Sequence, residues 1–283
     1  SPPARPRRVH WSGAHRLYRM DPRQRLEQHI EAGAAVTVAA LRAPISQADQ
    51  FGVVEAAADG HTISAFREKP KDAVGLADAP DQVFASMGNY IFTTDALVKA
   101  VRADAEASSS KHDMGGNIVP MLVEHGSAHV YDFSRNTVPG ESERDRGYWR
   151  DVGTLDAFYD AHMDLISVHP VFNLYNRKWP IYTSVPQHPP AKFVLEDGGR
   201  TGRAHNSLVS TGCIISGATV RNSVLSPGCI IDSHALIEDS VLMHDVVVGD
   251  GAIVKRAIID KHVVIPPGAR IGCDPEADRR RFT

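Results

Sequence analysis

The sequence reads SVLSPGCIIDSHALIED at Ser223–Asp239, then SVLMHDVVVGDGAIVKR at Ser240–Arg256, then AIIDKHVVIPPGARIG at Ala257–Gly272. A small residue opens each of these lines, seventeen positions after the last, and aliphatic residues follow at six-residue steps. Self-similarity at a fixed short period indicates stacked coils. Steps of six, with three sides to a coil, predict a left-handed parallel β-helix. The aliphatic residues expected to point inward are Val224, Ile230, Leu236, Val241, Val247, Ile253, Ile258 and Val264, with Leu208, Ile214 and Val220 in a weaker line before them.

Glycines mark the expected corners of this β-helix, where a sharp bend favours a residue without Cβ. They are Gly212, Gly217, Gly228, Gly251 and Gly268. An all-β sandwich is the competing interpretation, but the register across four lines argues against it. The last line has Arg270 where an aliphatic residue is expected, which predicts that the final coil is cut short. A solenoid also needs covered ends, so we expect the β-helix to dock on another surface.

Composition limits the classes of protein to consider. The 283 residues are 42% hydrophobic and 23% charged, with a net charge of −3, which is ordinary for a soluble protein and predicts no binding to nucleic acid or membranes. No apolar run approaches the roughly 18 residues of a membrane span. The three isolated cysteines, Cys213, Cys229 and Cys273, are expected to be reduced, which predicts a cytoplasmic protein.

The residues before the repeat alternate between apolar runs and amphipathic stretches, which predicts an α/β layer with a mixed sheet. Asp21 and Pro22 are typical of a helix start, and Gly33 of its end. Asp59-Gly60, between two apolar runs, predicts a hairpin. We therefore divide the chain into an α/β domain at residues 1–168, a proline-rich linker at 169–205 and the β-helix at 206–283.

Polar groups gather at three expected strand ends, where α/β proteins bind ligands. Glu68-Lys69 directly follows a strand, so that the lysine could meet a phosphate and the carboxylate could accept sugar hydroxyls; the alternative is a solvated charge pair. Ser86-Met87-Gly88-Asn89 interrupts an apolar strand, at a β-bulge or where a ligand approaches the backbone. Trp149 and Asp151 would share one face of a strand. Trp149 could pack against a sugar while Asp151 binds Mg²⁺; the alternative is a buried aromatic residue and a helix cap.

Taken together, these segments carry a resemblance. The stretches FREKP, ASMGNYIF, HDMGGNIVP, YWRDVGTLDAFYDAH and FNLYNRKWP, followed by a six-residue repeat, resemble the bacterial glucose-1-phosphate adenylyltransferase family. The likeness runs from about Tyr18 to about Arg281 and covers the last two-thirds of a family member. It implies a truncated nucleotidyltransferase domain with a Rossmann-like mixed sheet, and the reaction of ATP with glucose 1-phosphate to give ADP-glucose and pyrophosphate for glycogen synthesis.

The resemblance also implies site residues. Glucose 1-phosphate would meet Gly52, Glu68, Lys69, Ser86, Asp113 and Trp149, with Lys69 on its phosphate; Lys69 and Asp151 would be catalytic, and Asp151 would bind Mg²⁺. The chain would form a homotetramer, or a hetero-oligomer with a full-length homologue.

The chain departs from the family pattern in two places. The ATP-phosphate loop GGxGxRLxPLT has no match in residues 1–283. The second metal-binding carboxylate should come from SGDHxYRMD, but SGAHRLYRMD offers Ala14 or His15 in its place, depending on the alignment. We therefore expect the 283-residue chain to have weak or no activity.

Two other functions compete with this one. A non-catalytic regulatory or assembly subunit would pair with a full-length homologue. An acyltransferase would use a histidine at a coil interface, and His234, His244 and His262 are the candidates, although solvated corner residues explain them as well.

Overall fold

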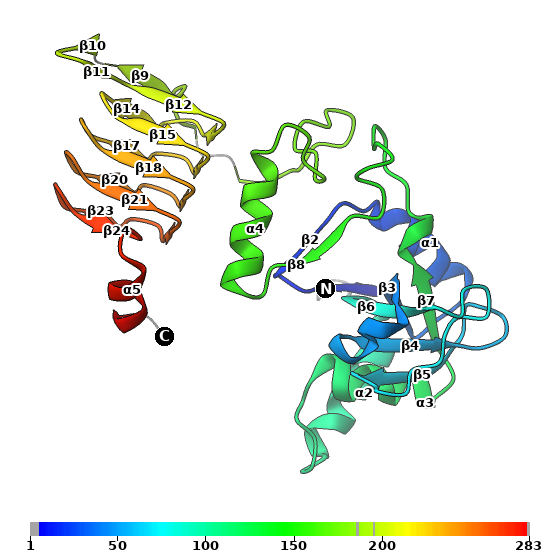
Figure 1. Cartoon of the computed structure of the whole chain (residues 1–283). Helices are drawn as coiled ribbons and strands as arrows, with labels where there is room; N and C mark the ends of the chain where they lie inside the picture. The colour runs from blue at the N-terminus through cyan, green and yellow to red at the C-terminus, as the bar shows by residue number, and fades with distance from the viewer. Residues whose placement is uncertain (1–5, 185–186, 195, 282–283) are drawn as a thin grey trace, which may run out of the picture. The chain divides into compact units, whose positions relative to one another are not determined.

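A computed structural model describes residues 6–184, 187–194 and 196–281. The chain forms two compact units, residues 1–150 and residues 151–283. Figure 1 shows a sheet with helices in the first unit and stacked coils in the second. Among the described residues, no helix is long and apolar enough to cross a membrane.

A mixed six-stranded sheet organises the first unit, in the order β5-β4-β6-β3-β7, with β1 also paired to β6. β3 runs parallel to β7, and the other pairs are antiparallel. The long strand β6 pairs β4 through its first half and β1 through its second half, while β3 lines its other side. The strands are β1 (Arg8–Ser12), β3 (Val36–Pro44), β4 (Gly52–Ala56), β5 (Ile63–Glu68), β6 (Gln82–Thr93) and β7 (Ala128–Asp132).

Helices α2 and α3 cover one face of this sheet. Their buried side chains, among them Ala100, Val119 and Leu122, pack in one cluster with Val38 and Phe92 of the strands. A second cluster, with Met87 and Phe133, lies apart from it and includes the half-buried Trp149. The helices, turns and remaining strands are α1 (Pro22–Glu31), η1 (Ile45–Gln50), α2 (Thr94–Glu106), the π-turn η2 (Met114–Ile118), α3 (Val119–Glu124), η3 (Phe133–Arg135), and the paired strands β2 (Arg16–Tyr18) and β8 (Trp149–Asp151).

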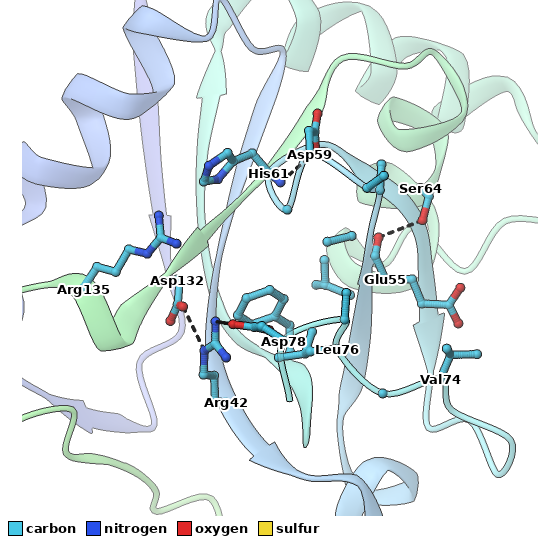
Figure 2. Close-up of a pocket in the computed structure, with 18 residues that line it drawn as sticks. Arg42, Glu55, Asp59, His61, Ser64, Val74, Leu76, Asp78, Asp132 and Arg135 are labelled. Carbon is cyan, nitrogen blue, oxygen red and sulfur yellow. Dashed lines mark hydrogen bonds and ion pairs between the residues drawn. The ribbon is translucent and has the colours of Figure 1, made fainter. Parts of the chain in front are cut away.

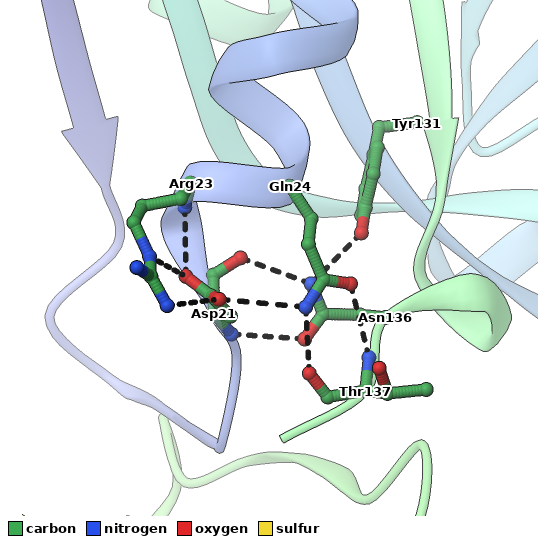
Figure 3. Close-up of polar contacts among 6 residues, drawn as sticks. All are labelled: Asp21, Arg23, Gln24, Tyr131, Asn136 and Thr137. Carbon is green, nitrogen blue, oxygen red and sulfur yellow. Dashed lines mark hydrogen bonds and ion pairs between the residues drawn. The ribbon is translucent and has the colours of Figure 1, made fainter. Parts of the chain in front are cut away.

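Helix α1 begins as the sequence predicts, and its start is held by a polar network (Figure 3). Asp21 caps the helix by accepting from the Arg23 N–H at 2.9 Å. The buried Asn136 side chain accepts from the Asp21 N–H at 2.9 Å, and it donates to the Asp21 carbonyl at 3.0 Å and to the Tyr131 hydroxyl at 2.8 Å. This network fixes the chain just after β2, and so it fixes where β2 points.

Helix α4 (Leu155–Leu165) lies near the start of the second unit, and Thr154 caps it by accepting from the Ala157 N–H at 3.2 Å. A parallel β-helix follows, and the predicted fold class is confirmed. Its three sheets are in the orders β12-β15-β18-β21-β24, β13-β16-β19-β22 and β23-β20-β17-β14-β9. Within the repeat, residues paired across neighbouring coils are 16 or 17 positions apart in the sequence, as Val224, Val241 and Ile258 are.

The strands of the β-helix are short. They are β9 (Lys192–Val194), β12 (Arg203–His205), β13 (Leu208–Val209), β14 (Ile214–Ser216), β15 (Thr219–Arg221), β16 (Val224–Leu225), β17 (Ile230–Ile231), β18 (Leu236–Glu238), β19 (Val241–Leu242), β20 (Val247–Val248), β21 (Ile253–Lys255), β22 (Ile258–Ile259), β23 (Val264–Ile265) and β24 (Arg270–Ile271). The hairpin β10 (Glu196–Asp197) and β11 (Arg200–Thr201) lies among them, and α5 (Pro275–Arg281) ends the unit. Because β9 and β12 already pair with coil strands, the coils begin before residue 206.

The predicted inward positions of the β-helix are wrong by one residue along most of its length. Ile231 and Val248 are fully buried, whereas Val264 is 70% exposed. Two aliphatic residues stand together in most strands, and neighbours on a strand point to opposite faces, so the six-residue step alone did not decide which one faces inward. The inward residues are Ile215, Val220, Leu225, Ile231, Ile237, Leu242, Val248, Val254, Ile259 and Ile265. The expected break at Arg270 is also wrong, because β24 continues its sheet and the inward residue there is Ile271.

The corners of the β-helix use left-handed backbone, as predicted, at all five glycines named above. Non-glycine residues share such corners, among them His234 at φ 59° and His262 at φ 61°. Their rings lie beside Asp250 at 3.0 Å and Asp245 at 3.5 Å, so each histidine pairs with the coil above or below it.

The small residues that open each line form a ladder of hydrogen bonds between coils. The Ser223 Oγ accepts from the Ser240 N–H at 3.1 Å, and the Ser240 Oγ accepts from the Ala257 N–H at 3.3 Å. Each hydroxyl also donates to a carbonyl two residues back, that of Arg221 at 2.6 Å from Ser223. The small residues that recur every seventeen positions therefore hydrogen-bond one coil to the next.

Candidate functional site

The ends of β4 and β5 bring three of the predicted residues together. Gly52 stands opposite Glu68 in the antiparallel pair, and a Cβ at Gly52 would lie 3.1 Å from the Glu68 carboxylate. Lys69 follows with φ 48°, and its N–H donates to the Phe51 carbonyl at 2.9 Å. A lysine in left-handed backbone is strained, and such residues cluster at ligand sites. The glycine leaves the Glu68 carboxylate accessible from the side of β4.

The interruption of β6 is a β-bulge. The register with β3 shifts so that Ala39 faces Asn89 while Ala40 faces Ser86. Gly88 has φ 69°, and its N–H donates to the Ser86 Oγ at 3.2 Å. The bulge alternative considered for this segment therefore holds. Bulges re-aim side chains, and this one changes which faces Ser86 and the residues after it occupy.

The pKa of the Tyr90 hydroxyl is shifted by burial and by several polar and charged side chains. Burial raises the pKa of Tyr90, the Ser86 hydroxyl lowers it by hydrogen bonding, the charges of Asp113 and Glu68 raise it, and Arg16 lowers it. Ser86 belongs to β6, Glu68 to β5 and Arg16 to β2, and Asp113 is the residue before η2. Three of them, Glu68, Ser86 and Asp113, belong to the predicted sugar-binding set.

Asp113 is held by the turn that follows it. Its Oδ1 accepts from the Gly116 N–H at 2.5 Å and so caps the π-turn. A Cβ at Gly115 would lie 3.4 Å from the Tyr90 hydroxyl, so only a small residue keeps that approach open. His112, just before, has φ 56° and pairs with Asp104 at 2.7 Å. Among the described residues of the first unit, Lys69 and His112 are the non-glycine positions with positive φ, and both adjoin predicted site residues.

The Trp149 ring contacts two neighbouring side chains. Its ring meets the edge of Phe51, the residue before Gly52, with centroids 6.1 Å apart. The Arg16 guanidinium lies over the same ring, 5.1 Å from its centroid. The indole Nε1 is buried, with no hydrogen-bond partner among the described residues. A half-buried aromatic face with an unused donor suits the apolar face and hydroxyls of a sugar.

Sequence reasoning gave no role to Arg16 or Tyr90, and it included Asn89 in a candidate stretch without assigning it a role. Asn89 is fully buried, and its Oδ1 accepts from the Tyr18 hydroxyl at 3.4 Å, while its Nδ2 has no partner among the described residues. Tyr90 stands in an apolar strand, and the polar Asn89 beside it was the available signal in the sequence. Arg16 stood in the very segment that departs from the family pattern.

Asp151 is the first residue of the second unit, and its Oδ1 accepts from the Gly153 N–H at 2.7 Å. Its predicted Mg²⁺ contact stays a prediction. Mg²⁺ takes oxygen ligands, and the segment before Tyr18 offers Ala14 and His15, both exposed, instead of the expected carboxylate. Among the described residues, no cluster of three or more potential metal ligands occurs.

A separate pocket of about 360 Å³ lies between the β4–β5 turn and the loop before β6 (Figure 2). None of the predicted site residues lines it. Its central Arg42 is paired with Asp132 and with Asp78, each at 2.9 Å. Because these charges already satisfy one another, we assign the pocket no role.

Comparison with known proteins gives two family matches. The family model of the nucleotidyl transferases matches residues 9–168, and that of the GlmU-like C-terminal hexapeptide proteins matches residues 189–283. Proteins named glucose-1-phosphate adenylyltransferase are similar to the chain: that of Parafrankia sp. (strain EAN1pec) is 60% identical over 95% of the chain, that of Frankia casuarinae 58% over 95%, and that of Corynebacterium kroppenstedtii 59% over 96%. In each case the chain spans 65% of the relative's length.

Proposed function

The chain belongs to the nucleotidyl transferase family, and from this premise we propose that its first unit holds the glucose 1-phosphate half of a glucose-1-phosphate adenylyltransferase site. The names of the relatives support the substrate, at 58 to 60% identity. The observation that carries the proposal is the geometry at the ends of β4 and β5, where Gly52 stands opposite Glu68 and the preceding Phe51 contacts the Trp149 ring. Hydrogen-bonding groups on one side and an aromatic face on the other are what a sugar needs.

Each residue then has a chemical role in binding. Glu68 and Asp113 accept hydrogen bonds from sugar hydroxyls, and Ser86 can donate or accept. Lys69 meets the phosphate as a point charge. Trp149 packs against the apolar face of the ring. The same contacts would hold glucose 1-phosphate while its phosphate oxygen attacks the α-phosphorus of ATP, where the bond to the β-phosphate breaks and pyrophosphate leaves.

The transfer itself is proposed for the longer protein that the relatives represent. Positioning and charge neutralisation carry most of such a reaction, so the residues around the ATP phosphates decide the rate. The 283 residues hold no match to GGxGxRLxPLT. We therefore expect this chain on its own to bind the sugar phosphate but to release little or no pyrophosphate from ATP. ATP binding, Mg²⁺, a role in glycogen synthesis and the tetramer or hetero-oligomer stay predictions.

Calorimetric titration of the full chain with glucose 1-phosphate tests the proposal. Lys69→Gln should raise the Kd at least about tenfold, which is about 1.4 kcal/mol. Lys71→Gln is the matched control, because Lys71 is an exposed lysine two residues further on, and it should leave the Kd unchanged. Glucose 6-phosphate should bind more weakly than glucose 1-phosphate. Equal Kd values for the Lys69 variant and the unchanged chain would contradict the proposal.

A further inference from the structure

A buried carboxylate near the end of helix α2 holds the loop that leads to Asp113. Asp104 is 4% exposed. Its Oδ1 accepts from the Ser110 hydroxyl at 2.5 Å, and its Oδ2 accepts from the His112 Nδ1 at 2.7 Å. Because a carboxylate can only accept, the His112 ring carries a proton on Nδ1. One side chain of α2 therefore binds two residues of the loop.

The Ser110 hydroxyl also holds the backbone of His112. It accepts from the His112 N–H at 3.0 Å, while the Ser110 N–H donates to the Ala107 carbonyl at 3.0 Å. His112 has φ 56°, which is uncommon for a residue with a Cβ and persists only where the surroundings fix it. The direction in which the chain leaves His112 therefore depends on the Asp104 carboxylate.

Asp113 is the next residue, and the π-turn η2 holds it from the other side. The Asp113 N–H donates to the Asn117 Oδ1 at 3.2 Å, and the Asp113 Oδ1 accepts from the Gly116 N–H at 2.5 Å. A Cβ built at Gly115 would lie 3.6 Å from the Asp113 Oδ1 and 3.4 Å from the Tyr90 hydroxyl. The loop between α2 and η2 therefore sets where the Asp113 carboxylate stands beside β6.

We propose that Asp104 is a positioning residue of the sugar site, and that it places the Asp113 carboxylate by holding Ser110 and His112. The inference rests on the proposed function, in which Asp113 accepts a hydrogen bond from a sugar hydroxyl. Asp104 is buried and each of its oxygens binds the loop, so it acts on the sugar through Asp113 and not by contact. It follows that Asp104 contributes to affinity only while Asp113 is present.

A double-mutant cycle tests this dependence, with the Kd of the full chain for glucose 1-phosphate measured by calorimetry. Asp113→Ala should raise the Kd about tenfold, because a hydrogen bond to a charged group is lost. Asp104→Ala should raise it about fivefold to tenfold. The variant with both substitutions should bind within a factor of about two of Asp113→Ala, whereas independent effects would multiply to about fiftyfold or more.

Three further variants separate positioning from general damage. Asp104→Asn keeps two hydrogen-bonding atoms in the same shape and should bind within about threefold of the unchanged chain. Glu106→Ala is the matched control and should leave the Kd unchanged, because Glu106 is an exposed carboxylate of the same helix end without a hydrogen bond in the part of the chain that the structure describes. Melting temperatures show that each variant is folded. If Asp104→Ala does not fold, Ser110→Ala takes its place in the cycle.

The outcomes separate this inference from the proposed function. Multiplied losses, or an Asp104→Ala variant that binds as tightly as the unchanged chain, would overturn the role of Asp104 and leave the sugar-phosphate site standing. An Asp113→Ala variant with an unchanged Kd would overturn it as well, since Asp104 would then have no sugar contact to place. No binding of glucose 1-phosphate by the unchanged chain would overturn both proposals.

Discussion

Replacing Ser223 by alanine tests the hydrogen-bond ladder that joins the coils of the β-helix. The Ser240 N–H is buried, and its acceptor among the described residues is the Ser223 Oγ at 3.1 Å. The same hydroxyl donates to the Arg221 carbonyl at 2.6 Å. Leaving a buried donor unsatisfied costs about 1–3 kcal/mol, beyond the modest net value of the bond itself. We therefore expect Ser223→Ala to lower the free energy of unfolding by about 2 kcal/mol.

Urea denaturation followed by circular dichroism measures this loss, and hydrogen exchange of the Ser240 amide localises it. Ser226→Ala is the matched control, because Ser226 lies in the same coil and its hydroxyl makes no hydrogen bond among the described residues. It should change stability by less than about 0.5 kcal/mol. If Ser223→Ala costs no more than this control and the Ser240 amide keeps its protection, the ladder does not stabilise the coils.

Two further predictions concern the two units separately. His29 is fully buried between the hydroxyls of Thr37 and Thr93, and burial lowers its pKa from the ordinary 6.5 to about 4. As the pH falls, the unfolded chain therefore binds a proton at His29 before the folded chain does. The stability that the neutral His29 contributes is complete above pH 6.5, and about 2 kcal/mol of it is lost by pH 5. Urea midpoints at both pH values should show this loss, and His29→Gln should remove it; an equal loss in the variant would contradict the assignment. Gly228→Ala should destabilise the β-helix more than Gly251→Ala, because both have positive φ but only at Gly228 would a Cβ meet another residue, the Asp245 Oδ1 at 2.2 Å; equal melting temperatures would show that Asp245 moves aside at no cost.

The repeat predicted the β-helix from sequence because each coil contributes the same pattern again. The inward face could not be predicted from that pattern, since Ile230 and Ile231 are both aliphatic and only packing decides between them. Ile231 is buried because the side chains of its sheet stack in register, with Val248 in the next coil. Continuation of the last coil past Arg270 depended on the same choice.

Family motifs predicted residues of the candidate site, among them Gly52 and Glu68, which stand opposite each other in β4 and β5. Tyr90 was not predicted, because it stands in a run of apolar residues and an aromatic residue there is typical of a core. Arg16 was not predicted because a strand of three residues has no periodicity from which to infer a direction.

Strand β6 lies in the middle of the sheet and also carries residues of the candidate site. It hydrogen-bonds to three other strands, and its residues include the core aromatic Phe92 as well as Ser86 and Tyr90. A substitution that retunes ligand preference from this strand would also disturb packing on both sides of it. Under the proposed function, divergence toward another sugar would therefore begin outside β6, at exposed residues such as Glu68 and Asp113.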